Sequence, residues 1–263
     1  MLVSSRSLVP LFALAAATAC AAPAVDWTDD RAIRASGSAN VLSADGGIRP
    51  DSAQLASMAP PAPHCAGSVR LARSRDKLFA VWWAPRPDSG ARLMASRSDD
   101  GGVTWRTAAV VDSTDKSASG CGRPSPAIAA DSISGYVHVS YGLRAQEGPG
   151  LFFSHSMDGG ISFHSPVPIL YGERLGRTSV AADGDNVAVA FEDPNSAAPR
   201  VGLALSRTMG HIFEERILPV SDDHGAASRP LVAVAGNRLA IAWREGADSG
   251  AGTILRVRRG TIR

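Results

Sequence analysis

The feature that most constrains the fold of this 263-residue chain is a repeat of just over 50 residues. Three copies start with an arginine and continue as two short apolar runs. These arginines, Arg123, Arg177 and Arg229, recur after 54 and 52 positions (from 123 to 177 and from 177 to 229). A looser copy starts near Ser68 without the arginine. Short strands repeated at this period are typical of the four-stranded antiparallel blades of a β-propeller.

Turn residues separate the runs within each copy. The pairs Gly184-Asp185 and Gly236-Asn237 suit tight hairpins, because both residue types tolerate positive φ. Third strands are predicted at Arg92–Ser98, Gly150–Ser156 and Val201–Ser206, and fourth strands at Arg106–Asp112, His164–Leu170 and Phe213–Val220. The sequence therefore predicts an all-β fold with four blades, or five if residues 21–63 build another.

The last copy has three strands and ends with Thr253–Val257. Its outer strand is expected from the N-terminal region, with Asn40–Ser43 as the candidate. Pairing the two ends of the chain would close the ring and hide exposed sheet edges.

The N-terminus is typical of a targeting segment. The apolar run Leu8–Ala19 is too short to cross a bilayer but suits a secretory signal. The residues Ala17–Cys20 are similar to a bacterial lipobox, which predicts lipidation of Cys20; simple cleavage to a soluble periplasmic protein is the alternative. We expect residues 1–19 to be a signal peptide, 20–63 a lipidated N-terminus, linker and possible closing strand, and 64–263 the propeller, exported to the cell envelope and anchored on the periplasmic side, with the outer membrane favoured.

Two turns carry a specific motif at the same place in consecutive copies. The first reads S-x-D-x-G-x-T-W and the second S-x-D-x-G-x-S-F, while a third turn at 208–213 keeps only the glycine and the aromatic residue. The motif residues are Ser98, Asp100, Gly102 and Trp105, then Ser156, Asp158, Gly160 and Phe163. On these two boxes the chain resembles the sialidase-like (BNR/Asp-box) β-propellers over residues 64–260, in which the box is the turn between the third and fourth strands of a blade.

The boxes suit a structural role. A turn aspartate accepts hydrogen bonds from nearby backbone N–H groups, glycine adopts a backbone angle closed to other residues, and the aromatic ring packs between sheets. A calcium loop is the competing interpretation, but it needs more oxygen ligands at close spacing than these turns carry.

Strand order predicts where a site would lie. In an up-and-down blade the first strand starts on the face where the second strand ends, and the box turn lies on the opposite face. The repeated arginines therefore fall at one mouth of the central tunnel. The ends of the second strands bring Tyr141, Glu192, Asp193 and Glu245 to the same mouth.

The resemblance gives these residues possible roles. It implies that Arg123, Arg177 and Arg229 clamp a ligand carboxylate, as guanidinium forks do well. It also implies that carboxylates with Tyr141 serve as acid/base and nucleophile in glycoside cleavage. Structural pairing is the alternative, because Arg177 falls opposite Glu192 across the Gly184-Asp185 turn, and Arg229 falls beside Arg244 and Glu245.

Cys65 and Cys121 occupy similar positions at the starts of adjacent inner strands. In an exported protein this placement predicts a disulfide between neighbouring blades. Free thiols, or a thiolate–imidazole metal site with His64 and His224, are the alternatives.

The chain departs from the sialidase pattern in ways that keep two functions open. The first copy has Gly67–Val69 where the others have arginine, and no tyrosine follows Tyr171. The first hypothesis is a module that binds a glycan, an anionic small molecule or an envelope protein; the second is an exo-α-sialidase-type hydrolase. We expect no cofactor and no metal. A formal net charge of +2 argues against nucleic acid as a partner, and membrane contact is expected only through the lipid anchor.

Overall fold

A computed structural model of the chain describes residues 23–33, 65–222, 225–246 and 254–263. Within these ranges every regular element is a β-strand, apart from one 3-10 turn, η1 (Ala66–Ser68). This confirms the predicted all-β class. None of the described elements is a helix with the length and apolar character needed to cross a membrane. The proposed signal peptide, Cys20, the linker, the candidate strand at 40–43, His64 and His224 lie outside the described residues.

The strands form four antiparallel sheets; the first three are each built from consecutive strands, and the fourth joins the last strands to the N-terminal ones. The first sheet contains β3 (Arg70–Ser74), β4 (Lys77–Pro85), β5 (Ala91–Ser98) and β6 (Ala109–Asp112). The second contains β7 (Ala127–Ala130), β8 (Val137–Ala145), β9 (Gly148–Ser156) and β10 (Val167–Tyr171). The third contains β11 (Thr178–Asp183), β12 (Asn186–Glu192), β13 (Val201–Ser206) and β14 (Leu218–Pro219). The fourth contains β15 (Ala227–Ala235), β16 (Arg238–Glu245) and β17 (Ile254–Ile262), with β1 (Val25–Trp27) and β2 (Arg31–Ile33) on its outer edge.

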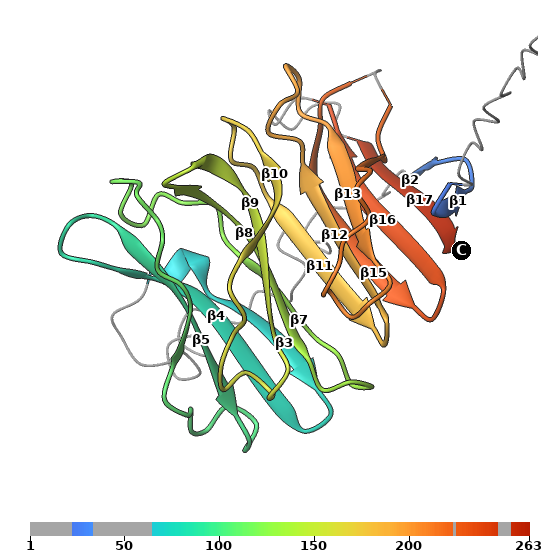
Figure 1. Ribbon diagram of the computed structural model, residues 1–263. Coiled ribbons are helices and arrows are strands. Elements are labelled where there is room, and N and C mark those ends of the chain that lie inside the picture. The colour runs from blue at the N-terminus through green and yellow to red at the C-terminus, as the bar shows by residue number, and fades with distance from the viewer. Residues whose placement is uncertain (1–22, 34–64, 223–224, 247–253) are drawn as a thin grey trace, which may run out of the picture.

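The four sheets stand side by side in chain order (Figure 1). The first strand of each sheet contacts the first strand of the next, from β3 to β7, β11 and β15. A hydrophobic cluster fills each space between neighbouring sheets; Trp83 and Val139 belong to the first cluster, Phe153 and Val189 to the second, and Leu203 and Ile241 to the third. Strands such as β8 and β13 are buried along almost their whole length, because both of their faces meet another sheet.

The N-terminal strands complete the fourth sheet. β1 pairs with the end of β17 at 260–262, and β2 pairs with its beginning at 255–257. Arginines of β17 hold this edge: Arg256 pairs with Asp30, and the Arg258 guanidinium lies 4.9 Å from the centre of the Trp27 ring.

The two box turns have one hydrogen-bond pattern. In the second box the Ser156 hydroxyl accepts the Gly160 N–H at 2.7 Å, and Asp158 accepts the Ser162 N–H at 2.9 Å and its hydroxyl at 2.5 Å. Ser98, Gly102, Asp100 and Thr104 make the same bonds in the first box. Desolvation is outweighed by these donors, which lower the pKa of Asp158 to about 2. Both carboxylates are thus occupied inside their own turns.

The degenerate third turn keeps the geometry without the aspartate. Thr208 takes its place and accepts the Ile212 N–H at 2.9 Å, while Gly210 donates to Ser206 as in a complete box. Gly210 has φ +85°, which favours glycine. Phe213 then meets Phe153 edge to face, with ring centres 4.8 Å apart, across the second and third sheets.

Candidate functional site

The first strands of all four sheets line one central cavity of about 330 Å³. Arg70, Arg177 and Arg229 bring arginine to its wall from the first, third and fourth sheets. The second sheet contributes Ser125 instead. The cavity therefore has a cationic wall assembled from separate sheets.

Glu192 joins two of these arginines through their backbones. One carboxylate oxygen accepts the Arg229 N–H at 2.7 Å and the other accepts the Arg177 N–H at 3.1 Å. The Glu192 N–H in turn donates to the Arg177 carbonyl at 3.0 Å. A single carboxylate at the end of β12 thus fixes the starts of the inner strands of the third and fourth sheets.

The backbone around the Glu192 carboxylate adopts conformations and close approaches that few residues tolerate. Arg229 has φ +54°, a left-handed conformation that costs a non-glycine residue roughly 1–2 kcal/mol, and β15 has an irregular register between Ser228 and Leu231. At Gly176 a Cβ atom would lie 2.6 Å from Glu192 Cβ, so only glycine fits there. A second cavity of about 300 Å³ shares Ser125 and Arg177 with the central one and reaches Glu192.

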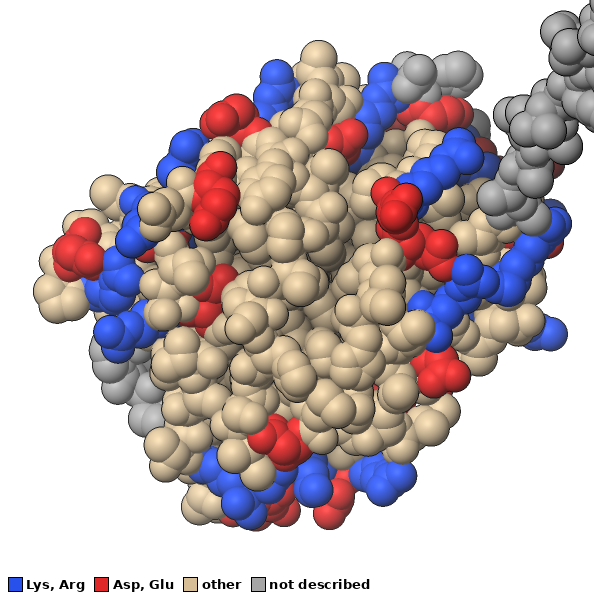
Figure 2. Space-filling view, viewed as in Figure 1, with Lys and Arg blue, Asp and Glu red and all other residues tan. Residues whose placement is uncertain are grey.

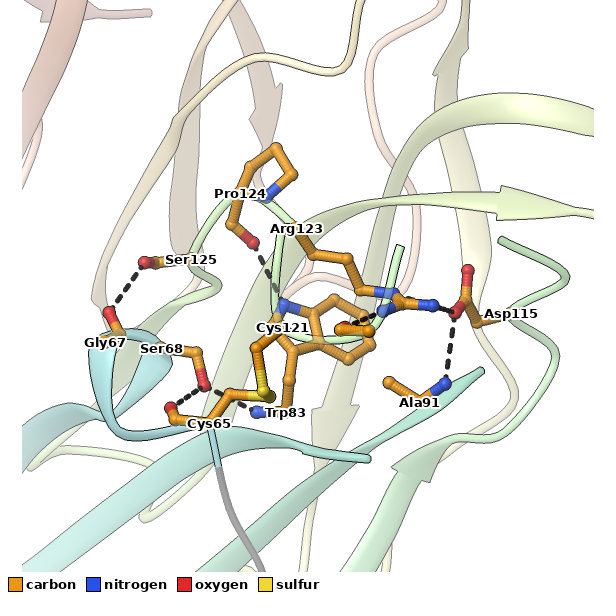
Figure 3. Close-up of a disulfide and its surroundings, with 11 residues drawn as sticks. Cys65, Gly67, Ser68, Trp83, Ala91, Asp115, Cys121, Arg123, Pro124 and Ser125 are labelled. Carbon is orange, nitrogen blue, oxygen red and sulfur yellow. Dashed lines mark hydrogen bonds and ion pairs between the residues drawn. A yellow bond between two sulfur atoms is a disulfide. The ribbon is translucent and has the colours of Figure 1, made fainter. Parts of the chain in front are cut away.

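Arg123 does not belong to this clamp, which corrects the expectation. Its side chain is 3% exposed and its ion-pair partner, Asp115, is 1% exposed. The Arg123 Nε donates to Asp115 at 2.8 Å (Figure 3). The other guanidinium nitrogens donate to Asp115 and to the carbonyls of Gly120 and Ser117. The Arg123 side chain is thus hydrogen-bonded to the loop that precedes β7, and it stabilises that loop.

Cys65 and Cys121 form a disulfide between the first and second sheets, with Cα atoms 5.4 Å apart. Because the sulfurs are bonded to each other, the alternative of a thiolate metal site is wrong. Trp83 lies beside the disulfide, and its indole N–H donates to the Pro124 carbonyl at 2.9 Å (Figure 3). The Arg123 guanidinium lies 5.9 Å from the Trp83 ring centre, so disulfide, indole and ion pair lie together. Cys65, the indole and the ion pair are buried, and Cys121 is exposed.

Tyr141 lies in the core, not at the tunnel mouth where it was expected. It is fully buried, and its hydroxyl donates to Asp112 at 2.8 Å. Burial, then the charge of Asp112, raises the pKa of Tyr141 well above its usual value of 10. The alternation of β8 explains the error, since Val139, Tyr141 and Leu143 share the face that packs against the first sheet.

Asp193 and Glu245 have structural partners. Asp193 accepts the Asn195 N–H at 2.9 Å within the turn after β12. Glu245 pairs with Arg256 of β17, and its side chain is 12% exposed. Neither residue lines the central cavity, so of the four expected catalytic groups only Glu192 lies near the arginines.

Sequence reasoning missed Arg70, Asp115 and a group of histidines. In the first copy the repeat was aligned on Gly67–Val69, which directly precedes Arg70. Shifting that alignment by one to three positions would have found Arg70.

Among the described residues no three His, Cys, Asp or Glu side chains are arranged to hold a metal ion.

The expectation against nucleic acid as a partner stays a prediction. In Figure 2 acidic and basic side chains alternate around the rim of this face, and its middle is mostly uncharged.

Comparison with known proteins identifies a fold and no family. No family model matches the chain, and no curated protein matches it. A protein of unknown function from Dyadobacter fermentans DSM 18053 is 17% identical with a TM-score of 0.51, over 71% of this chain and 50% of that one. The Hadza microbial sialidase Hz136 is 19% identical with a TM-score of 0.48, over 72% of this chain and 43% of that one. The Trypanosoma rangeli sialidase is 14% identical with a TM-score of 0.46, over 68% of this chain and 34% of that one. The chain thus spans half or less of these solved chains, and at such identities the likeness concerns the fold alone.

Proposed function

We propose that the four sheets are blades of a sialidase-like propeller whose central cavity binds the carboxylate of an acidic sugar without cleaving it. The observation that carries this proposal is the convergence of Arg70, Arg177 and Arg229 on one cavity from three different sheets. Guanidinium groups bind carboxylates in a planar, two-point fashion. A volume of about 330 Å³ lies at the small end of ligand pockets and suits one sugar ring.

The placement of the tyrosines favours binding over hydrolysis. The chain has three tyrosines, and none of them lines the cavity. Both oxygens of Glu192 accept backbone N–H groups, so this carboxylate is already engaged in holding the backbone of Arg177 and Arg229. Glycoside cleavage usually needs two free carboxyl-type groups on opposite sides of the scissile bond.

Calorimetric titration tests the proposal. N-acetylneuraminic acid and glucuronic acid are expected to bind, and neutral N-acetylglucosamine is not. Arg177→Ala is expected to weaken binding of the acidic sugar by about 10- to 100-fold, the effect of losing a charged hydrogen bond. Arg92→Ala removes an exposed arginine of β5 as the matched control and should leave the affinity unchanged.

Two results would contradict this proposal. One is equal affinity for the acidic and the neutral sugars, or no binding of either kind. The other is turnover of a fluorogenic sialoside that disappears in Arg177→Ala, which would establish the exo-glycosidase alternative.

We further propose that the module is displayed in the cell envelope through a lipid on Cys20. The apolar run Leu8–Ala19 supports export, and so does the disulfide, because such bonds persist in oxidising compartments. Growth with a radioactive fatty acid should label the wild-type protein and leave Cys20→Ser unlabelled. A labelled Cys20→Ser protein, or an unlabelled wild type, would refute lipidation.

A further inference from the structure

Four imidazoles gather where the second and third sheets meet, at the end that carries the box turns. His138 lies on β8, His155 on β9 and His164 just before β10, while His211 comes from the turn between β13 and β14. The His155 ring stacks on His164 with centres 4.7 Å apart and meets His211 edge to face at 4.7 Å. His138 lies beneath, 6.3 Å from His155.

The first and third sheets carry opposite charges at the positions that flank the box. In the first sheet Arg106 pairs with Asp99 at 2.5 Å, and in the third Arg207 donates to Glu214 at 2.9 Å. The second sheet has Met157 and His164 at these two places. The second box therefore lacks the ion pair that flanks the boxes of the first and third sheets.

Burial keeps the inner rings neutral. His138 is fully buried, and neither of its ring nitrogens has a hydrogen-bond partner; Nε2 of His155 is also buried without one. Burial and the neighbouring histidines lower the pKa of His138 to about 3 and that of His155 to about 4.

Few charged groups compensate a proton here. Asp131 is the acidic group that favours charged His138, but its carboxylate already accepts the Ser134 and Ile133 N–H groups. The Tyr136 ring stacks on His155 with centres 6.0 Å apart, and Arg207 and Glu214 of the facing turn pair with each other.

We propose that this imidazole cluster is a proton-operated latch: neutral rings hold the turn of residues 207–213 against the second sheet, and their protonation releases it. The contacts beneath the turn carry the mechanism. A Cβ at Gly210 would lie 2.7 Å from the Phe153 ring and 3.5 Å from Nδ1 of His138, so the turn sits directly on the cluster. A proton on His138 or His155 buries a positive charge beneath the turn that carries His211, and hydrating this charge requires the turn to move away. The latch is independent of the proposed sugar binding.

The sign of the pH dependence follows from the lowered pKa values. Both rings have folded-state pKa values below the ordinary 6.5, so their contribution to stability is complete above about pH 6.5 and is lost as the pH falls toward 4. Two such rings are expected to raise the unfolding equilibrium constant roughly 50-fold between pH 6 and pH 5. Urea unfolding followed by tryptophan fluorescence at these pH values measures the effect.

Two variants separate the latch from general acid sensitivity. His138→Leu removes the buried ring and should reduce the change to about 8-fold. His138→Leu with His155→Phe removes both rings whose pKa is lowered and should flatten the profile. His64→Gln, outside the described residues, is the control and should follow wild type.

Hydrogen exchange corrected for intrinsic rates supplies the local measurement. Protection of the amides of residues 207–213 should fall in wild type at pH 5 before that of the strands, and should persist in the variant that lacks both His138 and His155. A flat wild-type profile from pH 7.5 to 5, an equal slope in every variant, or uniform loss of protection over all strands would overturn the proposal.

Discussion

Asp115→Ala is expected to lower the free energy of unfolding by about 3–5 kcal/mol, because it leaves the buried Arg123 guanidinium without its counter-charge. The carboxylate also accepts the N–H of Ala91 at 3.3 Å and that of Ser117 at 3.2 Å, so further donors lose a partner. Urea unfolding at pH 7 measures the loss.

The surface pair Arg144–Glu173 of the second sheet provides the matched control. Its side chains are 50% and 79% exposed, so Glu173→Ala should cost far less. The double substitution Asp115→Leu with Arg123→Met removes both charges and should recover much of the lost stability. If Asp115→Ala and Glu173→Ala proved equally mild, the assignment of Arg123 to a buried structural pair would fail.

Replacing both cysteines by alanine is expected to cost about 4 kcal/mol, the chain-entropy estimate for a disulfide that closes a loop of this length. The bond joins positions 56 apart and fastens the first sheet to the second. Wild type in a reductant should fall to the stability of Cys65→Ala/Cys121→Ala, and the variant itself should not respond to the reductant. Reductant-insensitive stability of the wild type would contradict this expectation.

The losses of unfolding free energy from Asp115→Ala and from the double cysteine substitution should not add. Arg123 lies two residues from Cys121, and both pack beside Trp83. Once the disulfide is absent, the loop that holds Asp115 is less constrained, so Asp115→Ala should cost less in the cysteine-free protein. A double-mutant cycle measures this coupling.

The repeat predicted the fold well because strand order follows from local signals. The expected third strand at Val201–Ser206 coincides with β13, and Gly184 adopts φ +59° in the predicted two-residue turn. Fourth strands were placed less well. β14 is only Leu218–Pro219, where Phe213–Val220 was expected, because Phe213 turns inward onto Phe153 and Pro219 has no N–H for a ladder.

The site could be predicted only where the backbone determines it. The hairpin register brought Arg177 opposite Glu192, and their backbone hydrogen bond agrees with that placement. The placements expected for Arg123 and Tyr141 were wrong, because the polar groups of these residues are hydrogen-bonded to tertiary partners, Asp115 and Asp112. Those aspartates lie 8 and 29 positions away, in segments to which no local pattern assigns a partner. The histidine latch was missed because its members come from two sheets.

The pairing of β1 and β2 with β17 has a consequence for the order of folding. Hydrogen bonds such as that from Thr28 to Arg259 join residues 231 positions apart, so the fourth sheet has a very high contact order. Its outer edge cannot form until the last strand has been synthesised, whereas the first three sheets each close within their own repeat. An emerging chain would therefore hold sheets one to three before its first described residues find their place. Completion of the fourth sheet would be the final step, and substitutions at the β1–β17 edge should affect unfolding rates more than folding rates.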